Sequence, residues 1–471
     1  MSRRPIQLIH PVWNINESEL TFDSLAEQVM KEGLEGFQGR PIIRLCLVEL
    51  SEFRSTNMNS KSITKLQEIG VEIIRIASSE SEQYLENFLT NDERHSLQLN
   101  AGGIGVAREA CTIICTCHLD LSDNPIIWFL DDDLQFRQLR NTECGNISLD
   151  HHQNLFEDVW SFHERNPTVV SSLGGVTGCP PLPASSSLLT NLQDLSSHVR
   201  GGESFSVNDN RWDIPDYYYD LSENPGRVDT VFPNPEWEPV GNLRDAILCH
   251  GSLFRPVILT EKRMNSVESN RLVRGGNTLI YDLSSFVSNP YPTLEIGNLR
   301  TRRGDTIWSC FTSFIDGGKI LSHNMLLHHG RDSIHWDEAQ RSRFIQRMLA
   351  DLYGAAYYRT ISSAHKLEKF REIDDLLELT NQLYLEIKNR AKRHQHTLTL
   401  SEKIAKEISQ FGPKYHELCS EVIRLSRDAI LALETLPSKD ELHVALIESW
   451  SRATLWKEQI GPRLRTRLNS H

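Results

Sequence analysis

Residues 125 to 136 read PIIWFLDDDLQF, an apolar run of large side chains that leads directly into three consecutive aspartates. The apolar run predicts a buried strand of an α/β sheet. Ligands of such sheets bind outside the carboxyl ends of the strands. The aspartates Asp131, Asp132 and Asp133 therefore fall where a functional site is expected.

Side chains of an extended segment alternate between two faces, so Asp131 and Asp133 are expected to point one way and Asp132 the other. Adjacent carboxylates repel one another unless a cation neutralises them. Mn²⁺ and Mg²⁺ accept oxygen ligands and often bridge carboxylates to substrate phosphates. We therefore predict a metal site on Asp131 and Asp133. The alternative interpretation is an acidic turn in contact with solvent.

The composition is that of a soluble globular protein with room for two or three domains: 471 residues, 39% apolar, net charge -13. The negative balance disfavours a general nucleic-acid binder. No apolar run reaches the roughly 20 residues that span a bilayer, and the N-terminal residues lack the apolar core of a secretory signal. We expect a cytoplasmic protein. The cysteines of CTIICTC (111–117) are interpreted as buried thiols, with a zinc site as the alternative.

Strand-like and helix-like segments alternate in the first part of the chain. Four apolar runs predict strands: 40–50, 70–77, 124–130 and 167–178. Three segments have helical character: 62–70, 106–119 and 151–165. This alternation predicts an α/β fold, with a mixed, mostly parallel sheet flanked by helices. We assign residues 1–335 to this domain, with an irregular insertion at about 180–270 that is rich in Ser, Pro, Asn and Asp.

Residues 336–471 predict a separate all-α domain, because Gly and Pro become scarce and helical spacing dominates. Gly412-Pro413 predicts a helix break, and Ser438 with Glu441 has the spacing of a capping box. One apolar stripe of a long helix is predicted to contain Phe370, Ile373, Leu377, Leu383 and Ile387. Such stripes either pack only on each other or form a homo-oligomer interface or a platform for a partner protein.

A series of motifs resembles the GT-A fold glycosyltransferases, especially the inverting group that includes galactofuranosyltransferases and many polysaccharide synthases. The resemblance covers roughly residues 40–332. Its motifs are NAGGIGVAREA (100–110), WFLDDDLQF (128–136), VVSSLGGVTGCPPLPA (169–184), VRGGNTLIYDLSSF (273–286), RRGDTIWSCFTSF (302–314) and ILSHNMLLHHGRD (320–332). It implies a GT-A type sheet and a metal-dependent transfer of a sugar from a nucleotide-sugar donor, for which a UDP-sugar is the commonest choice.

The resemblance also assigns roles to residues. Asp305 matches the general base of the inverting enzymes, although the family usually has Glu-Asp or Asp-Asp where this chain has Gly-Asp; the alternative is a helix N-cap. His329 or His328 matches a third metal ligand, with His329 favoured. The residues expected to contact the donor are Val48, Glu49, Ser51, Arg108, Asp131 and Asp132. Arg108 is expected to pair with a carboxylate or with a phosphate.

Two other functions remain open at this stage. The first is a catalytically inactive GT-A-like scaffold whose helical domain binds partner proteins. The second is a metal-dependent phosphoryl-transfer domain of the TOPRIM kind, in which Glu49 would act with the aspartates. The sequence does not identify the acceptor, which could be a protein, a peptide, a glycan or a modified base.

Overall fold

The structure is a computed structural model. It describes residues 3–12, 18–35, 42–50, 60–99, 104–141, 147–178, 184–200, 229–230, 243–248, 257–258, 278–291, 293–330, 336–366 and 376–470. Three features predicted from the sequence lie outside these ranges: Ser51, the glycine-rich turn at 101–103 and most of the insertion at 180–270.

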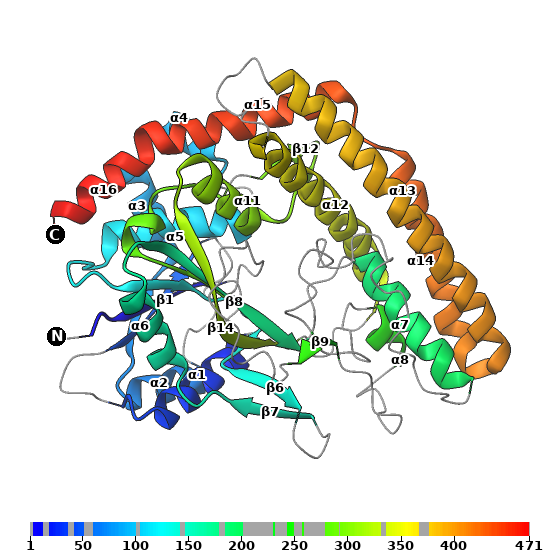
Figure 1. Ribbon diagram of the computed structural model, residues 1–471, viewed down its shortest axis with the longest axis horizontal. Coiled ribbons are helices and arrows are strands. Elements are labelled where there is room, and N and C mark those ends of the chain that lie inside the picture. Colours follow the sequence, from blue (N-terminus) through cyan, green and yellow to red (C-terminus); the bar gives the residue numbers. More distant parts are fainter. Residues whose placement is uncertain are drawn as a thin grey trace.

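A mixed β-sheet forms the centre of the first 330 residues (Figure 1). Its strands follow the order β3, β2, β1, β4, β11, β8, β10, β9, and β14 pairs with β8 and with the short β5. Strands β1 to β4 are parallel and β14 is parallel to β8, whereas β11 is antiparallel to β4 and β8. The strand bounds are Ile6–Val12 (β1), Ile43–Glu49 (β2), Glu72–Ile76 (β3), Ile126–Phe129 (β4), Leu134–Gln135 (β5), Val169–Gly178 (β8), Asp229–Thr230 (β9), Val257–Ile258 (β10), Leu279–Tyr281 (β11) and Lys319–His329 (β14).

These observations confirm the predicted α/β fold with a mixed, mostly parallel sheet and a helical C-terminal region. The four predicted strands correspond to β2, β3, β4 and β8. The three predicted helices correspond to α2, α5 and α6. Helices of the α/β part have the bounds Glu19–Lys31 (α1), Lys61–Glu68 (α2), Ser78–Phe88 (α3), Asn91–Leu97 (α4), Ile104–His118 (α5), Leu155–Arg165 (α6), Leu283–Phe286 (α10) and Gly304–Cys310 (α11). Two short hairpins have the strands Arg137–Asn141 (β6), Ile147–His151 (β7), Glu295–Ile296 (β12) and Leu299–Arg300 (β13).

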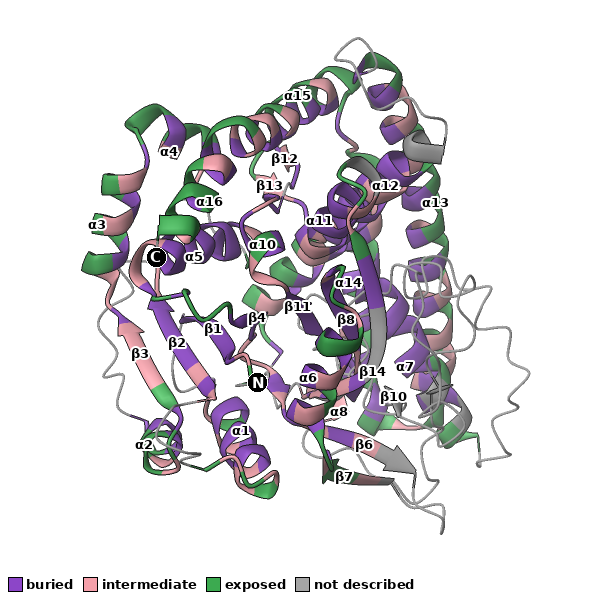
Figure 2. Cartoon of the chain, turned by 60° about the vertical axis from the view of Figure 1, so that its left-hand side comes forward, coloured by how far each residue is buried: buried purple, intermediate pink, exposed green. Residues whose placement is uncertain are grey.

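The sequence analysis missed β1, which is a central strand between β2 and β4. All seven of its residues are buried, and Figure 2 shows the strand in the purple of buried residues. The strand was not predicted because its sequence, IQLIHPV, contains polar residues and a proline. Tertiary contacts satisfy the polar groups: His10, for example, contacts Ser18 Oγ and the carbonyl oxygen of Leu130.

The C-terminal part consists of long helices. Their bounds are Glu338–Lys366 (α12), Leu376–Ile408 (α13), His416–Glu434 (α14), Lys439–Leu455 (α15) and Gly461–Ser470 (α16). The break at Gly412-Pro413 and the capping box of Ser438 and Glu441 are confirmed. In the described part of the chain, no helix combines the length and the apolar character needed to cross a lipid bilayer.

The predicted apolar stripe of α13 is wrong at Leu377, whose exposed fraction is 64%, whereas Leu383 and Ile387 are fully buried. A step of six residues turns a helix by about 240°. Leu377 therefore faces away from Leu383, while the four-residue step from Leu383 to Ile387 keeps one face. Phe370 and Ile373 lie outside the described residues.

Apolar packing continues across the predicted domain boundary at residue 335. One cluster joins Leu188 and Leu192 of α7 (Ala184–Val199) and Ile307 of α11 to the long helices. In a second cluster, Leu464 of α16 packs with core residues of the sheet and α5, and Figure 1 shows α15 and α16 returning over this half. The boundary thus marks a change of secondary structure, and the two halves share their cores.

The interpretation of the whole insertion as irregular is also wrong, because residues 184–199 form α7 and residues 243–248 form α8 (Leu243–Leu248). The side chains of α7 are rich in Ser, Thr and Asn, which are poor helix formers. Packing on α13 compensates for this weak propensity: Ser185 Oγ lies 2.6 Å from His394 Nδ1 of α13, and both residues are buried.

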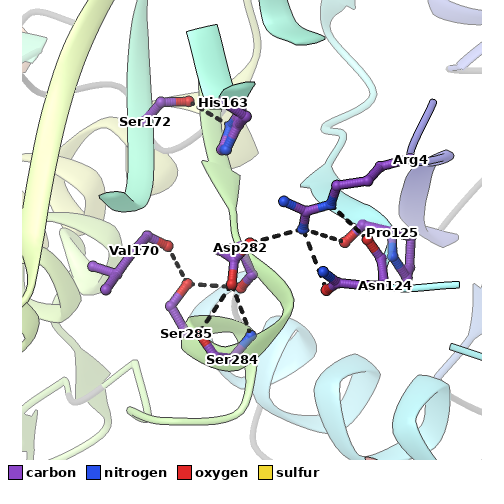
Figure 3. Close-up of polar contacts among 9 residues, drawn as sticks. All are labelled: Arg4, Asn124, Pro125, His163, Val170, Ser172, Asp282, Ser284 and Ser285. Carbon is purple, nitrogen blue, oxygen red and sulfur yellow. Dashed lines mark hydrogen bonds and ion pairs between the residues drawn. The ribbon is translucent and has the colours of Figure 1, made fainter. Parts of the chain in front are cut away.

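At the amino-terminal end of β4, Arg4 ties the start of the chain to the sheet (Figure 3). Its Nε donates to the carbonyl oxygen of Asn124 at 2.7 Å. Its Nη2 donates to Asp282 Oδ1 at 2.7 Å and also contacts Asn124 Oδ1 and the Pro125 carbonyl oxygen. We call these four residues the Arg4 cluster.

Candidate active site

The three aspartates follow β4 at the carboxyl edge of the sheet, as predicted. The turn is fixed through its backbone. The carbonyl oxygen of Leu130 accepts a hydrogen bond from His10 Nδ1 at 3.2 Å, and the carbonyl oxygen of Asp132 accepts one from Thr21 Oγ1 at 3.0 Å. Burial lowers the pKa of His10 to about 4, so its imidazole is neutral at physiological pH. The backbone of the aspartate turn is therefore held in place by hydrogen bonds to the carbonyl groups of Leu130 and Asp132.

Asp131 pairs with Arg108 of α5. The Nη2 atom of Arg108 donates to Asp131 Oδ1 at 3.0 Å, and the arginine side chain is only 3% exposed. Its guanidinium lies 5.7 Å from the ring centre of Phe129 and 5.8 Å from that of Tyr291. Its Nε is buried without a hydrogen-bond partner in the described part of the structure. The buried guanidinium group of Arg108 is thus held in place, but not all of its N–H groups form hydrogen bonds.

The electrostatics of Asp131 show which groups lie near it. Burial raises the pKa of Asp131; Arg108 opposes this shift, and the charges of Asp133 and Asp305 raise the pKa further. The same acidic groups act on Arg108: burial alone would lower its pKa, but Asp131 and, more weakly, Asp305 raise it. Carboxylates from two distant parts of the chain therefore lie close enough to repel one another.

Asp133 contacts His329 at the end of β14. The His329 Nε2 atom lies 2.8 Å from Asp133 Oδ2. The pairing of β14 with β5 produces this contact, since His329 is the register partner of Leu134 and the Gly330 amide donates to the Asp133 carbonyl oxygen.

His328 lies on the other face of β14. It packs against Gly178, where a side chain would collide with the imidazole ring. Burial, together with the smaller effects of the neighbouring His329 and Arg137, lowers the pKa of His328 to about 4. The structure therefore brings His329, and not His328, to the aspartates.

Asp305 lies in the first turn of α11. The interpretation of Asp305 as an N-cap is wrong, because the helix begins at Gly304 and Arg303 precedes it. Arg303 has φ of 84°, a left-handed conformation that costs free energy for a residue with a side chain. Its Nη2 atom contacts Asp351 of α12 at 2.8 Å, which helps to hold this conformation. Such strain is concentrated at functional sites.

We call Arg108, Asp131, Asp133, Asp305 and His329 the aspartate cluster. The other predicted contact residues do not join it. Val48 is fully buried in the core of the sheet. Glu49 accepts a hydrogen bond from the Ser78 amide at 3.2 Å, at the start of α3.

Asp132 is partly buried, and its carbonyl oxygen is bound by Thr21. For a TOPRIM-like site Glu49 would have to face the aspartates, but β1 separates β2 from β4. The structure thus assigns Glu49 a contact at a helix start.

Two buried tyrosines beneath the cluster were missed. The hydroxyl groups of Tyr281 and Tyr291 form a hydrogen bond. The Tyr291 ring stacks on Trp308 with ring centres 6.2 Å apart, and Trp308 is fully buried. Burial raises the pKa of both tyrosines, and Asp305 contributes to the rise. No local pattern identified them, because Tyr291 lies between prolines, as in an ordinary loop, and Tyr281 ends a strand of only three residues.

The described residues contain no group of three His, Cys, Asp or Glu side chains arranged to hold a metal ion. They do contain a two-donor pair, the carboxylate of Asp133 and the imidazole of His329. One or two protein ligands suffice for Mg²⁺ when substrate phosphates supply the others. The cluster therefore fits a metal ion that arrives with a phosphorylated substrate.

Neither the models of known protein families nor the curated proteins contain a match to this chain.

Proposed function

We propose that the chain is a metal-dependent glycosyltransferase of GT-A type, which transfers a sugar from a nucleotide-sugar, with UDP-sugars as the favoured donors, to an acceptor with inversion. The observation that carries this proposal is the aspartate cluster itself. Asp131 and Asp133 after β4, Asp305 in α11 and His329 in β14 belong to separate motifs of the resemblance. They meet at the carboxyl edge of the sheet, where ligands of α/β folds bind.

The charge of the cluster supports an anionic substrate that brings a cation. Asp131, Asp133 and Asp305 are acidic, whereas Arg108 is a cation that pairs with Asp131 and attracts Asp305. A nucleoside diphosphate alone would be repelled by this arrangement. Together with Mn²⁺ or Mg²⁺, held by Asp133 and His329, it would be attracted. The metal would neutralise the charge that develops on the leaving diphosphate.

The protein residues have distinct roles in the proposed reaction. The Asp305 carboxylate accepts the proton of the acceptor hydroxyl, which then attacks the anomeric carbon as the bond to the diphosphate breaks. Arg108 holds Asp131 through the contact at 3.0 Å. Its buried charge also attracts the carboxylate of Asp305. Removing the general base should therefore abolish transfer without removing donor binding.

A donor panel tests the proposal. The protein is incubated with Mn²⁺ and a set of nucleotide-sugars, and both donor hydrolysis and the shift of the melting temperature are measured. The expected result is stabilisation by UDP and by a UDP-sugar that requires Mn²⁺ and is lost with a chelator. No response to any nucleotide would reject the proposal and favour the scaffold alternative. Binding of UDP without binding of any UDP-sugar would argue against transfer.

A further inference from the structure

Tyr291 and Thr293 lie between the two helices that carry the site, and we call these two residues the Tyr291 segment. A Cβ atom on Gly105, in the first turn of α5, would lie 3.4 Å from Tyr291 Cβ. A Cβ atom on Gly304, in the first turn of α11, would lie 3.5 Å from the same atom. Both helix ends therefore rest on Tyr291. Because α5 carries Arg108 and α11 carries Asp305, this segment sets the separation of those helices.

Arg452 holds this segment from the C-terminal helices. Its Nη2 donates to the carbonyl oxygen of Thr293 at 2.5 Å, and its Nη1 donates to Gln98 Oε1 at 3.0 Å. Arg300 donates to the same Gln98 oxygen at 3.0 Å. Arg452 lies in α15 and is only 7% exposed. One buried side chain thus connects the helical part to the base of the site.

Glu109 holds the segment from the opposite side. Its Oε1 accepts a hydrogen bond from the Tyr291 amide at 2.7 Å. Burial raises the pKa of Glu109 to about 7, against the opposing effects of Arg452, the Tyr291 amide and Arg300. The carboxylate and the two guanidinium groups therefore form one buried network around Tyr291.

We infer that Arg452 of α15 is a positioning residue of the active site, which fixes the Tyr291 segment and through it the relative placement of Arg108 and Asp305. This inference rests on the proposed function. It makes the helical region part of the catalytic apparatus, beyond any role as a platform for partners. Arg452 is too far along this chain of contacts to be a catalytic residue, so its effect is expected on turnover more than on donor affinity.

The test compares Arg452→Met with Arg463→Met. Arg463 also connects the C-terminal helices to the first half, through Glu93 at 2.8 Å, but it has no contact with the Tyr291 segment among those described. Donor hydrolysis with UDP-sugar and Mn²⁺ gives kcat and KM, and calorimetry gives the affinity for UDP with Mn²⁺. We expect Arg452→Met to lower kcat about 10-fold or more with KM nearly unchanged, since small misplacements of reacting groups are costly. Arg463→Met should stay within about 2-fold of the wild type.

Arg452→Lys keeps the charge but cannot bind Gln98 and Thr293 at the same time, so its kcat should lie between those of the wild type and Arg452→Met. This variant also replaces Arg452→Met in the test if Arg452→Met does not fold. Wild-type turnover in both variants of Arg452 would overturn the inference. A wild type that responds to no nucleotide would instead reject the proposed function, and the two failures are thereby distinguished.

The pH dependence of the melting temperature is a further measurement, and a general loss of packing would not change it. The folded state binds the proton of Glu109 more tightly than the unfolded state, so stability is expected to fall as pH rises from the ordinary value of 4.5 to about 7. Without Arg452 the pKa of Glu109 rises further, and the fall extends to higher pH. The melting temperatures of Arg452→Met and Arg463→Met, measured across this range, should therefore diverge in their pH dependence. Parallel profiles would overturn the inference.

Discussion

Two arginine–aspartate pairs lie at opposite ends of β4, and they differ in how completely their hydrogen bonds are satisfied. In the Arg4 cluster, the contact to Asp282 is accompanied by three further oxygen acceptors from Asn124 and Pro125, and the arginine side chain is 31% exposed (Figure 3). In the aspartate cluster, Arg108 is 3% exposed and its Nε has no partner within the described ranges.

The comparison separates a pair that completes the local structure from a pair to which our proposal assigns a ligand. Asp282 also caps α10 by accepting from the Ser284 amide, so the Arg4 cluster completes the local structure. Asp131 instead has two further carboxylates close to it, Asp133 and Asp305. Repulsion within a buried site is unfavourable unless another charged group compensates for it. The first pair needs no such compensation, and in our proposal a bound cation supplies it for the second.

The largest expected effect comes from Asp305. Asp305→Asn removes the proposed base but keeps the size of the side chain, so transfer should fall by about 10³-fold, within the range of general base catalysis. Donor binding should stay nearly intact, because the Asp133–His329 pair is unchanged. Steady-state kinetics and calorimetry with UDP and Mn²⁺ measure the two quantities. Lost donor binding with unchanged turnover at saturation would contradict the assignment.

The next effect concerns stability at the two ends of β4. Arg108→Met leaves Asp131 buried without its cation, which should lower the free energy of unfolding by about 3 kcal/mol. The matched variant Arg4→Met breaks a partly exposed pair and should cost about 1 kcal/mol. Urea unfolding at neutral pH measures both. Equal losses, or a larger loss for Arg4→Met, would mean that the two pairs do not differ as described.

A smaller effect is expected from the two adjacent histidines. His329→Ala removes one donor of the proposed metal pair and should weaken Mn²⁺-dependent binding of UDP by about 10- to 100-fold. His328→Ala, on the other face of β14, is the control and should leave this binding nearly unchanged. Titration of UDP at fixed Mn²⁺ measures the affinities. A larger effect of His328→Ala than of His329→Ala would place the metal on the opposite face of β14 and contradict our proposal.

The smallest effect is expected beside the Arg4 cluster, at the amino-terminal end of β4. Burial, together with the smaller effect of the Arg4 charge, lowers the pKa of His163, beside the Arg4 cluster, to about 4. The unfolded chain, in which this pKa is near 6.5, therefore binds the proton more tightly, and stability is lost as pH falls from 6.5 towards 4. By about pH 5.5 this loss should reach about 1 kcal/mol.

His163→Gln should remove that part of the acid sensitivity, because glutamine does not titrate. Thermal unfolding at neutral and at mildly acidic pH, compared between the wild type and the variant, checks this expectation. An identical pH dependence in both proteins would show that His163 is not responsible.

Local patterns in the sequence predicted the elements whose residues carry their own signal. The apolar run before Asp131 predicted β4, and the alternation of an extended chain separated His328 from His329. The capping box at Ser438 was visible because its two residues are three positions apart. The same approach failed for β1, where polar residues are satisfied by distant partners, and for α7, where packing on α13 overrides weak helix propensity.

The sequence by itself therefore determined those strands and helices whose own residues carry a periodic or apolar signal, and which chemical groups end the strand at residue 130. Only the tertiary structure decided how these groups are paired. Arg108 meets Asp131, Asp133 meets His329, and Arg452 meets Gln98 across 354 positions of the chain. The physical reason is that periodicity and capping act within a few residues, whereas a buried charge must find its partner in three dimensions, and folding of the whole chain determines which groups are within reach.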